Sequence, residues 1–296
     1  MTMASRAVVL SGGGAAGGAW MLGILNALRE EGADLGDADL IVGTSAGARV
    51  AAALATGALR QAAQQCRDGL PATWVPVALG QFVEASMRII ADSPTEVEAA
   101  RRIANMGPLG DRLASGADRR RVIASQLPVQ EWPGQRLVIT AVDAESGRRV
   151  SFDAASGVGL VDAVTASGAL PGVYPLVPIG GRRYADGGVA SLYNADLAAG
   201  HDVVIVLTPA PPSDYLRAKL DAEIAALGAL AVHVVSADEQ SLAAIGPDPN
   251  SAAAAREALE AGAAQGRREV VRLKPVWRRP EPEPARPLRR CRRRLR

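Results

Sequence analysis

Leu40-Ile41-Val42-Gly43-Thr44-Ser45-Ala46-Gly47 is the stretch that decides the fold of this 296-residue chain. Its leading apolar residues predict a buried strand, and the small and aliphatic residues at 48–54 predict a helix directly after it. A serine between the two is typical of a nucleophile elbow, because flanking glycines let the backbone reverse sharply and leave the hydroxyl exposed. The alternative is an ordinary glycine-rich turn of an α/β sheet, and the motif by itself leaves both interpretations open.

A second glycine-rich turn follows the apolar residues 7–10 and leads into a segment with helical spacing of apolar side chains. Its glycines are Gly12, Gly13, Gly14 and Gly17. Such a turn exposes backbone N–H groups at a helix N-terminus and therefore favours an anion, either a phosphate or a developing oxyanion. The spacing also fits a dinucleotide-binding motif, but that motif expects an acidic residue at the end of the second strand, where this chain has Ser45.

The third motif is Asp186-Gly187-Gly188, which in isolation predicts only a turn. It becomes significant because it follows the other two motifs along the chain, and together the three motifs resemble the patatin-like phospholipase family. The resemblance extends from about residue 7 to about residue 207 and includes Ala166-Ser167-Gly168-Ala169-Leu170-Pro171-Gly172-Val173-Tyr174-Pro175-Leu176.

The resemblance implies a serine acyl hydrolase with a catalytic dyad, in which Ser45 is the nucleophile and Asp186 the base. It places the oxyanion hole at Gly12, Gly13 and Gly14. The supporting glycines of the motifs are Gly17, Gly43, Gly47, Gly187 and Gly188. One position departs from the family pattern: Ala16 stands where the family usually has a basic residue, so the backbone N–H groups keep their role and that side chain's contribution is lost.

A serine–aspartate dyad can work only where the carboxylate is partly shielded from water. A serine hydroxyl needs a neighbouring base, and a carboxylate with a pKa of about 4 is a weak one unless partial desolvation raises its proton affinity. A Ser–His–Asp triad is the alternative, with His201 or His233 as its third member. His233 lies in a strand-like run and His201 lies before a strand, at the edge opposite to that where α/β sheets bind ligands, so the dyad is favoured.

The chain reads as one α/β domain over residues 5–272, with a mostly parallel sheet and helices on both faces in the three-layer α/β/α arrangement of patatins. Strands are predicted near residues 7–10, 40–42, 136–142, 150–153, 203–207 and 230–235. The abundance of alanine and glycine and the 3% aromatic content predict helices packed closely on small side chains. We find no cluster of residues that suggests a metal site, and no cofactor is predicted.

Residues 59–128 contain no convincing strand and predict a helical cap inserted after the nucleophile helix. Leu79, Phe82, Val83, Met87 and Ile90 form one apolar stripe at helical spacing. The stripe either packs on the sheet or forms a lid or lipid-facing surface over the acyl pocket. A further helix is expected to begin with Ser93 as its N-cap, Pro94 at its first position and Glu96 completing a capping box.

Residues 275–296 form an arginine- and proline-rich segment with nine arginines and two glutamates, whose composition predicts a disordered basic tail. Its hypotheses are attraction to anionic lipid, non-specific nucleic-acid contact, or no required role. The chain shows no signal peptide and no apolar run long enough to span a membrane, which predicts a cytoplasmic protein, with peripheral membrane contact through the cap or the tail as a further hypothesis.

The function predicted from sequence is hydrolysis of acyl esters of lipids, of the phospholipase A or lysophospholipase type. Two alternatives remain: a nucleotide- or phosphate-binding α/β protein that uses the glycine loop without catalysis, and an acyltransferase that uses the same acyl-enzyme. No specific nucleic-acid partner is predicted.

Overall fold

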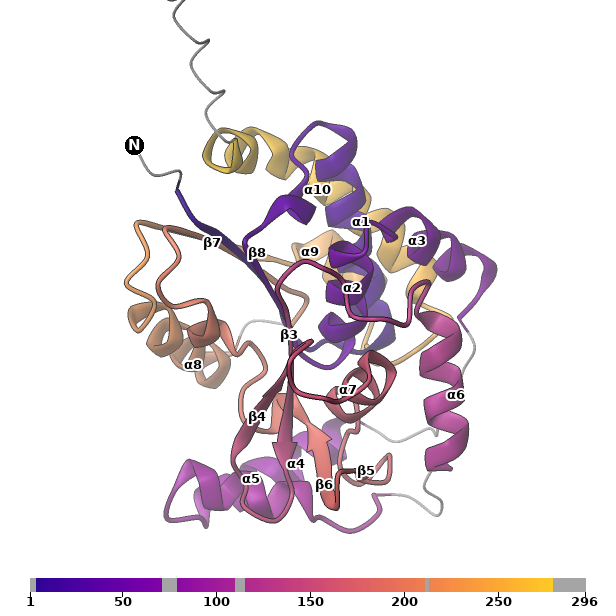
Figure 1. Ribbon diagram of the computed structural model, residues 1–296, viewed down its shortest axis with the longest axis vertical. Coiled ribbons are helices and arrows are strands. Elements are labelled where there is room, and N and C mark those ends of the chain that lie inside the picture. Colours follow the sequence, from indigo (N-terminus) through magenta and orange to yellow (C-terminus); the bar gives the residue numbers. More distant parts are fainter. Residues whose placement is uncertain (1–3, 71–78, 110–114, 211–212, 279–296) are drawn as a thin grey trace, which may run out of the picture.

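A single mixed sheet organises the computed structural model, which describes residues 4–70, 79–109, 115–210 and 213–278 (Figure 1). The strands are β1 (Arg6–Leu10), β2 (Leu40–Gly43), β3 (Leu137–Asp143), β4 (Arg149–Phe152), β5 (Val177–Ile179), β6 (Arg182–Asp186), β7 (Val203–Thr208) and β8 (Ala231–Ser236). Their order is β5-β6-β3-β2-β1-β7-β8, and β4 pairs with β3. The pairs among β1, β2, β3, β7 and β8 are parallel, while β4, β5 and β6 pair antiparallel. The predicted mostly parallel α/β sheet is confirmed.

Helices connect the strands and cover both faces of the sheet. They are α1 (Gly14–Glu30), α2 (Ala46–Ala55), α3 (Leu59–Asp68), α4 (Leu79–Ala91), α5 (Glu96–Ala104), α6 (Gly116–Gln126), α7 (Leu160–Ser167), α8 (Asp214–Ala225), α9 (Glu239–Ile245) and α10 (Ala255–Trp277). In Figure 1, α8 lies on one side of the strands and α1, α2 and α7 lie on the other. The three-layer arrangement predicted from the sequence is therefore present.

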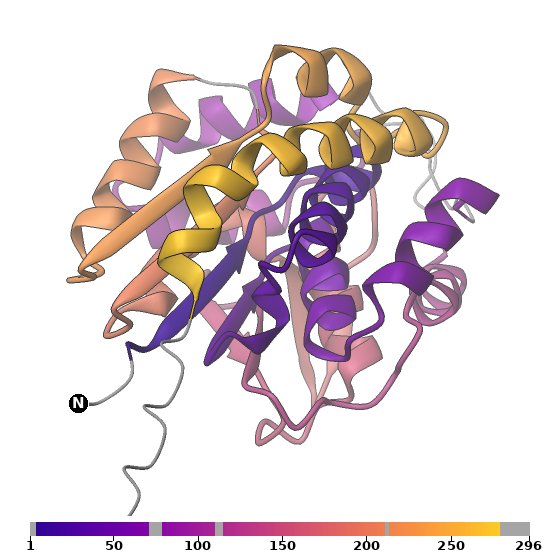
Figure 2. The same ribbon diagram turned by 90° about the horizontal axis from the view of Figure 1, so that it is seen from above.

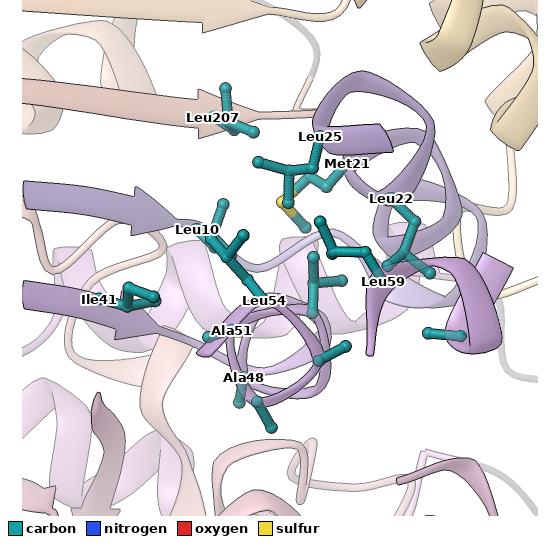
Figure 3. Packing of buried hydrophobic residues seen from close by; sticks show 14 of the residues in the cluster. Leu10, Met21, Leu22, Leu25, Ile41, Ala48, Ala51, Leu54, Leu59 and Leu207 are labelled. Atoms are coloured by element: carbon teal, nitrogen blue, oxygen red, sulfur yellow. The ribbon is translucent and has the colours of Figure 1, made fainter. Parts of the chain in front are cut away.

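The side chains of β1 pack against the helices on both faces of the sheet. Val8 and Leu10 belong to the large apolar cluster that includes α1 and α2, whereas Ala7 and Val9 belong to a second cluster on the α8 side. All four side chains are fully buried, because a parallel strand in the middle of such a sheet contacts helices on both faces. Figure 3 shows Leu10 of β1 facing Met21 and Leu25 of α1 and Leu54 of α2, which belong to the same apolar cluster.

Small residues set the closest helix contact. Helices α1 and α10 lie side by side in Figures 1 and 2. A Cβ at Gly23 would come within 2.2 Å of the Leu259 carbonyl oxygen, and one at Gly262 would come within 2.2 Å of the Trp20 carbonyl oxygen. The backbones therefore touch directly, as the alanine- and glycine-rich composition predicted.

The end of α10 is attached to the start of β1. The Arg6 guanidinium is buried, stacks 4.6 Å from the centroid of the Trp277 ring, donates to the Trp277 carbonyl and pairs with Asp37 at 2.8 Å. The tail predicted to begin at Pro275 thus starts too early, because α10 continues through Pro275 to the buried Trp277. The remainder of that predicted tail, from residue 279, lies outside the described residues.

The six predicted strands are present within one or two residues of their observed ends, but β5 and β6 were missed. The described residues of the predicted cap contain only helices, α3 to α6. The predicted N-cap of α5 is wrong: the Ser93 hydroxyl instead donates to the Ile89 carbonyl at the end of α4, and Thr95 caps α5 by accepting the Glu98 N–H at 3.2 Å. No helix in the described ranges combines the length and apolar character that crossing a membrane requires.

Candidate active site

The glycine loop and the serine turn meet because β1 and β2 are parallel neighbours. Their register pairs Leu10 with Gly43, so both turns leave the sheet at the same carboxyl edge. Ser45 has φ 54° and ψ −118°, a strained conformation for a residue with a side chain and the one expected of a nucleophile elbow. A Cβ at Gly47 would lie 2.2 Å from the Leu10 carbonyl oxygen, so only glycine lets α2 begin this close to β1.

The structure brings Ser45 and Asp186 into direct contact. The Ser45 hydroxyl donates to Oδ2 of Asp186 at 2.8 Å, across 141 residues of sequence. Asp186 ends β6, whose antiparallel pairing with β3 sets it opposite Ala141. The Gly188 N–H donates to the other carboxylate oxygen at 2.7 Å, which fixes the orientation of the carboxylate.

Asp186 has the electrostatic character that a carboxylate base needs. Its side chain is 3% exposed, and burial raises the pKa of its carboxyl from 3.8 to about 6. The hydrogen bonds from Gly188 and Ser45 and the nearby charge of Arg119 oppose that rise. The carboxylate is therefore a stronger base than in water and is still mainly ionised near neutral pH.

The glycine loop requires one correction to the predicted oxyanion hole. The Gly12 N–H donates to the Leu192 carbonyl at 2.9 Å, so Gly12 is not a free donor, although a Cβ there would lie 3.6 Å from that of Ser45. Within the described ranges, no acceptor is bonded to the N–H of Gly13, Gly14 or Ala46, and all three residues line the same cavity as Ser45. These three N–H groups therefore have no acceptor within the described ranges.

The supporting glycines lie where the motifs predicted, around these two turns. Gly17 and Gly47 lie in the first turns of α1 and α2, Gly43 ends β2, and Gly187 and Gly188 follow Asp186. The unusual Ala16 is buried in the first turn of α1 and donates its N–H to the Pro249 carbonyl at 2.8 Å.

The sequence did not predict the residues whose side chains form hydrogen bonds to Thr44 and Ser45 and so hold this turn in place. The Ser45 N–H donates to the Ser167 hydroxyl at 2.8 Å, and the Thr44 hydroxyl lies 2.9 Å from that of Thr140. Asn194, in the left-handed region with φ 54°, donates from Nδ2 to the Thr44 hydroxyl at 3.0 Å. Ser167 belongs to the stretch that carried the family resemblance, but no local pattern in the sequence pointed to Thr140 or Asn194.

The two histidines do not take part in this constellation. His233 lies in β8, paired with Ile205, and His201 contacts the Ala198 carbonyl before β7 begins. Neither lines the cavity of the dyad. With Ser45 already bonded to Asp186, the triad alternative has no geometric support.

A cavity of about 900 Å³ opens over the dyad. Its lining includes the glycine loop, Ser45 and Asp186, together with side chains of α4 and α6 of the cap. The apolar stripe of α4 lines this cavity through Leu79, Phe82, Val83, Met87 and Ile90. Val83 and Met87 remain 49% and 41% exposed, so the stripe faces the cavity and its rim and is not packed on the sheet.

Comparison with known proteins gives a family match and several similar solved structures. The family model described as patatin-like phospholipase matches residues 8–199. The fold is similar to that of VipD from Legionella pneumophila (16% identity, TM-score 0.46) and of ExoU (17% identity, TM-score 0.39), the latter also known in complex with SpcU from the type III secretion system of Pseudomonas aeruginosa. The alignments cover 91% and 92% of this chain but 67% of VipD and 53% of ExoU.

A search of curated proteins found no significant match. The family match covers more than half of the chain and includes the glycine loop, Ser45 and Asp186. This chain therefore belongs to the patatin-like phospholipase family.

Proposed function

We propose that this protein is a serine acyl hydrolase that cleaves acyl esters of lipids through a Ser45–Asp186 dyad and an acyl-enzyme intermediate. The observation that carries the proposal is the 2.8 Å hydrogen bond from the Ser45 hydroxyl to a buried carboxylate whose pKa is raised to about 6. Family membership supports a lipid hydrolase in general terms.

Acylation begins when Asp186 accepts the proton of Ser45 as Oγ attacks the ester carbonyl carbon. The carbonyl π electrons move to the oxygen, and the N–H groups of Gly13, Gly14 and Ala46 are placed to bind the resulting oxyanion. Collapse of this tetrahedral intermediate breaks the bond to the alcohol, which leaves with the proton held by Asp186. Ser45 is then esterified and Asp186 is again ionised.

Deacylation repeats the sequence with water. Asp186 accepts a proton from water as its oxygen attacks the acyl carbon, and the same N–H groups bind the second oxyanion. Collapse returns the proton to Ser45 Oγ and releases the carboxylic acid. An acyltransferase would follow the same steps with an alcohol in place of water.

The cavity supports a lipid substrate over a nucleotide. Its lining includes the apolar stripe of α4, which suits an acyl chain and offers no polar group to a ribose. The partly exposed Val83 and Met87 of the cap lie on the lining of this cavity, so we also propose that the cap contacts the surface of a membrane or micelle as a chain enters.

The test is hydrolysis of p-nitrophenyl esters of increasing chain length by the wild-type protein, Ser45→Ala and Asp186→Asn, with and without a chelator. Chelator-resistant activity that both substitutions abolish supports the dyad. Activity that survives Asp186→Asn would refute the assignment of the base. Addition of a primary alcohol as acceptor separates the two outcomes of deacylation, because a transferase yields the new ester in preference to free acid.

A further inference from the structure

Two arginines line the catalytic cavity, and in the described part of the chain no carboxylate is bonded to either of them. Arg49 comes from α2, one turn after Ser45, and Arg119 comes from α6 of the cap. Within the described ranges, neither forms an ion pair, whereas the third cation of the cavity lining, Lys219, is bonded to Glu96 at 2.6 Å. Unpaired guanidinium groups in a partly desolvated cavity are costly unless an anion is bound there.

Neutral groups hold both guanidinium groups in place. Arg49 donates from Nη1 to Oε1 of Gln126 at 2.5 Å. Arg119 donates from Nη2 to the Gly168 carbonyl at 2.6 Å and stacks 3.5 Å over the Tyr174 ring. The Nε of Arg119 is buried and has no partner in the described part of the chain. These contacts orient the two forks but leave their positive charge uncompensated.

The two arginines also act on each other and on the dyad. Burial lowers the pKa of each guanidinium, and the charge of Arg49 lowers that of Arg119 further. Asp186 is the carboxylate that interacts with Arg119, and the positive charge of Arg119 lowers the pKa of Asp186. Its oxygens accept hydrogen bonds from Ser45 and Gly188, and no ion pair in the described ranges joins it to either arginine, so its charge offsets that of Arg119 only in part and without direct contact. A ligand anion between the arginines would offset their mutual repulsion.

We propose that Arg49 and Arg119 form an anion subsite that holds the phosphate of a glycerophospholipid while its ester carbonyl lies at Ser45. The inference rests on the proposed acyl hydrolase function and adds its specificity: phosphate-bearing esters are selected over neutral ones. Arginine suits this role because its planar fork can hold two phosphate oxygens at once. The alternative ligand for this subsite is the carboxylate of the released fatty acid.

The decisive experiment compares two substrates with identical acyl chains, a phosphatidic acid and the corresponding diacylglycerol, in micelles of a neutral detergent at about pH 8, where Asp186 is ionised. The ratio of the two kcat/KM values is expected to fall about tenfold or more in Arg49→Met and in Arg119→Met. Arg49→Lys and Arg119→Lys are expected to retain part of the preference, because a single charge remains.

Arg121→Met is the matched control. Arg121 lies on the same helix as Arg119, is 76% exposed, pairs with Asp118 and is absent from the cavity lining, so its replacement is expected to leave the ratio unchanged. A ratio that is equally unchanged in both cavity variants would overturn the subsite. So would variants that alter only inhibition by free fatty acid, since the pair would then bind the product.

A second measurement needs no variant. A dialkyl ether phosphatidic acid, which cannot be hydrolysed, should inhibit wild-type hydrolysis of a neutral ester competitively and about tenfold more strongly than the matching dialkyl glycerol. Equal inhibition by the two ethers would refute the proposal. Absence of Ser45-dependent hydrolysis of any ester would instead refute the proposed function, so the two failures are distinguishable.

Discussion

The sheet half of the molecule and its cap helices place apolar side chains in opposite settings. In α2, which begins at the nucleophile, eight of the ten residues are buried against the sheet and its neighbours. In α4 of the cap, Ser86 is the single buried residue, while the apolar stripe faces the cavity. Under the proposed function, the first half fixes the position of Ser45 and the second offers an apolar surface to a ligand.

The largest expected effect is on the rigid half, at the dyad. Ser45→Ala and Asp186→Asn should each reduce ester hydrolysis by about a thousandfold or more, because nucleophile and base act as one unit. The double variant should be hardly worse than either single one. Initial rates with a chromogenic ester measure this, with circular dichroism as the folding control; additive losses would contradict a single dyad.

A matched pair of glycines tests the contrast in packing. Gly47→Ala places a Cβ 2.2 Å from the Leu10 carbonyl and should destabilise the protein by about 3 kcal/mol or more. Gly80→Ala, in α4, meets no atom within 4 Å and should be neutral or stabilising by up to about 1 kcal/mol, since alanine favours a helix. Denaturant unfolding compares them, and similar losses at both positions would contradict the distinction between the halves.

The charge of Asp186 makes the rigid half less stable than it need be. Because its pKa is raised from 3.8 to about 6 in the folded protein, the folded state binds the proton more tightly, and stability falls as pH rises through this window. Asp186→Asn should therefore stabilise the protein near pH 8, by at most about 3 kcal/mol, and have little effect near pH 3. Thermal unfolding across that range tests the sign; a gain that persists at low pH would point to another cause.

The same carboxylate sets the pH dependence of turnover. Asp186 must be ionised to accept the proton of Ser45, so kcat/KM should decline as pH falls through about 6 and level off above it. The charge of Arg119 lowers that pKa, so Arg119→Met should move the acidic limb to higher pH. A pH–rate profile measures both values, and an unmoved limb would show that Arg119 does not act on Asp186.

The smallest effect on stability is expected in the cap. Phe82→Ser and Ile90→Ser should change the melting temperature by less than about 2 °C, because both side chains face the cavity, but raise KM for long-chain esters about tenfold. Hydrolysis of a short-chain ester should be nearly unaffected. Leu54→Ser, at a buried position of α2, is the contrasting control and should unfold the protein. If the cap variants unfold as readily, the stripe is core and the lipid-facing interpretation is wrong.

The parts of the fold that could be predicted are those with a local signature. Uninterrupted apolar runs marked the parallel strands, and glycines at fixed spacing marked the two turns and the aspartate motif. Strands β5 and β6 were not predicted because Pro178, Gly180 and Gly181 are typical turn residues. The two strands are identified only by the pairing of β5 with β6 and of β6 with β3. The N-cap of α5 was misplaced because Ser93 had a nearer acceptor at the end of α4.

The parts of the site that could not be predicted depend on contacts distant in sequence. Ser167 is 122 residues from Ser45, and Asn194 is 150 residues from Thr44. Arg119 reaches the dyad because α6 folds over the cavity, and an isolated arginine in a helical segment reads as a solvated surface residue. The Gly12 donor was misassigned because the glycine pattern does not reveal that Leu192 already occupies its N–H.

The contact between Arg6 and Trp277 has a consequence for chain connectivity. It brings the first strand and the last described helix together at the amino end of β1 (Figure 2). Ser45 instead lies beyond the carboxyl end of the neighbouring β2. A circular permutant that links these two ends with a short peptide and opens the chain at Gly180-Gly181, where added Cβ atoms would meet nothing within 4 Å, should retain the catalytic geometry. Such a permutant would show that the catalytic geometry does not depend on the order in which the chain connects its strands and helices.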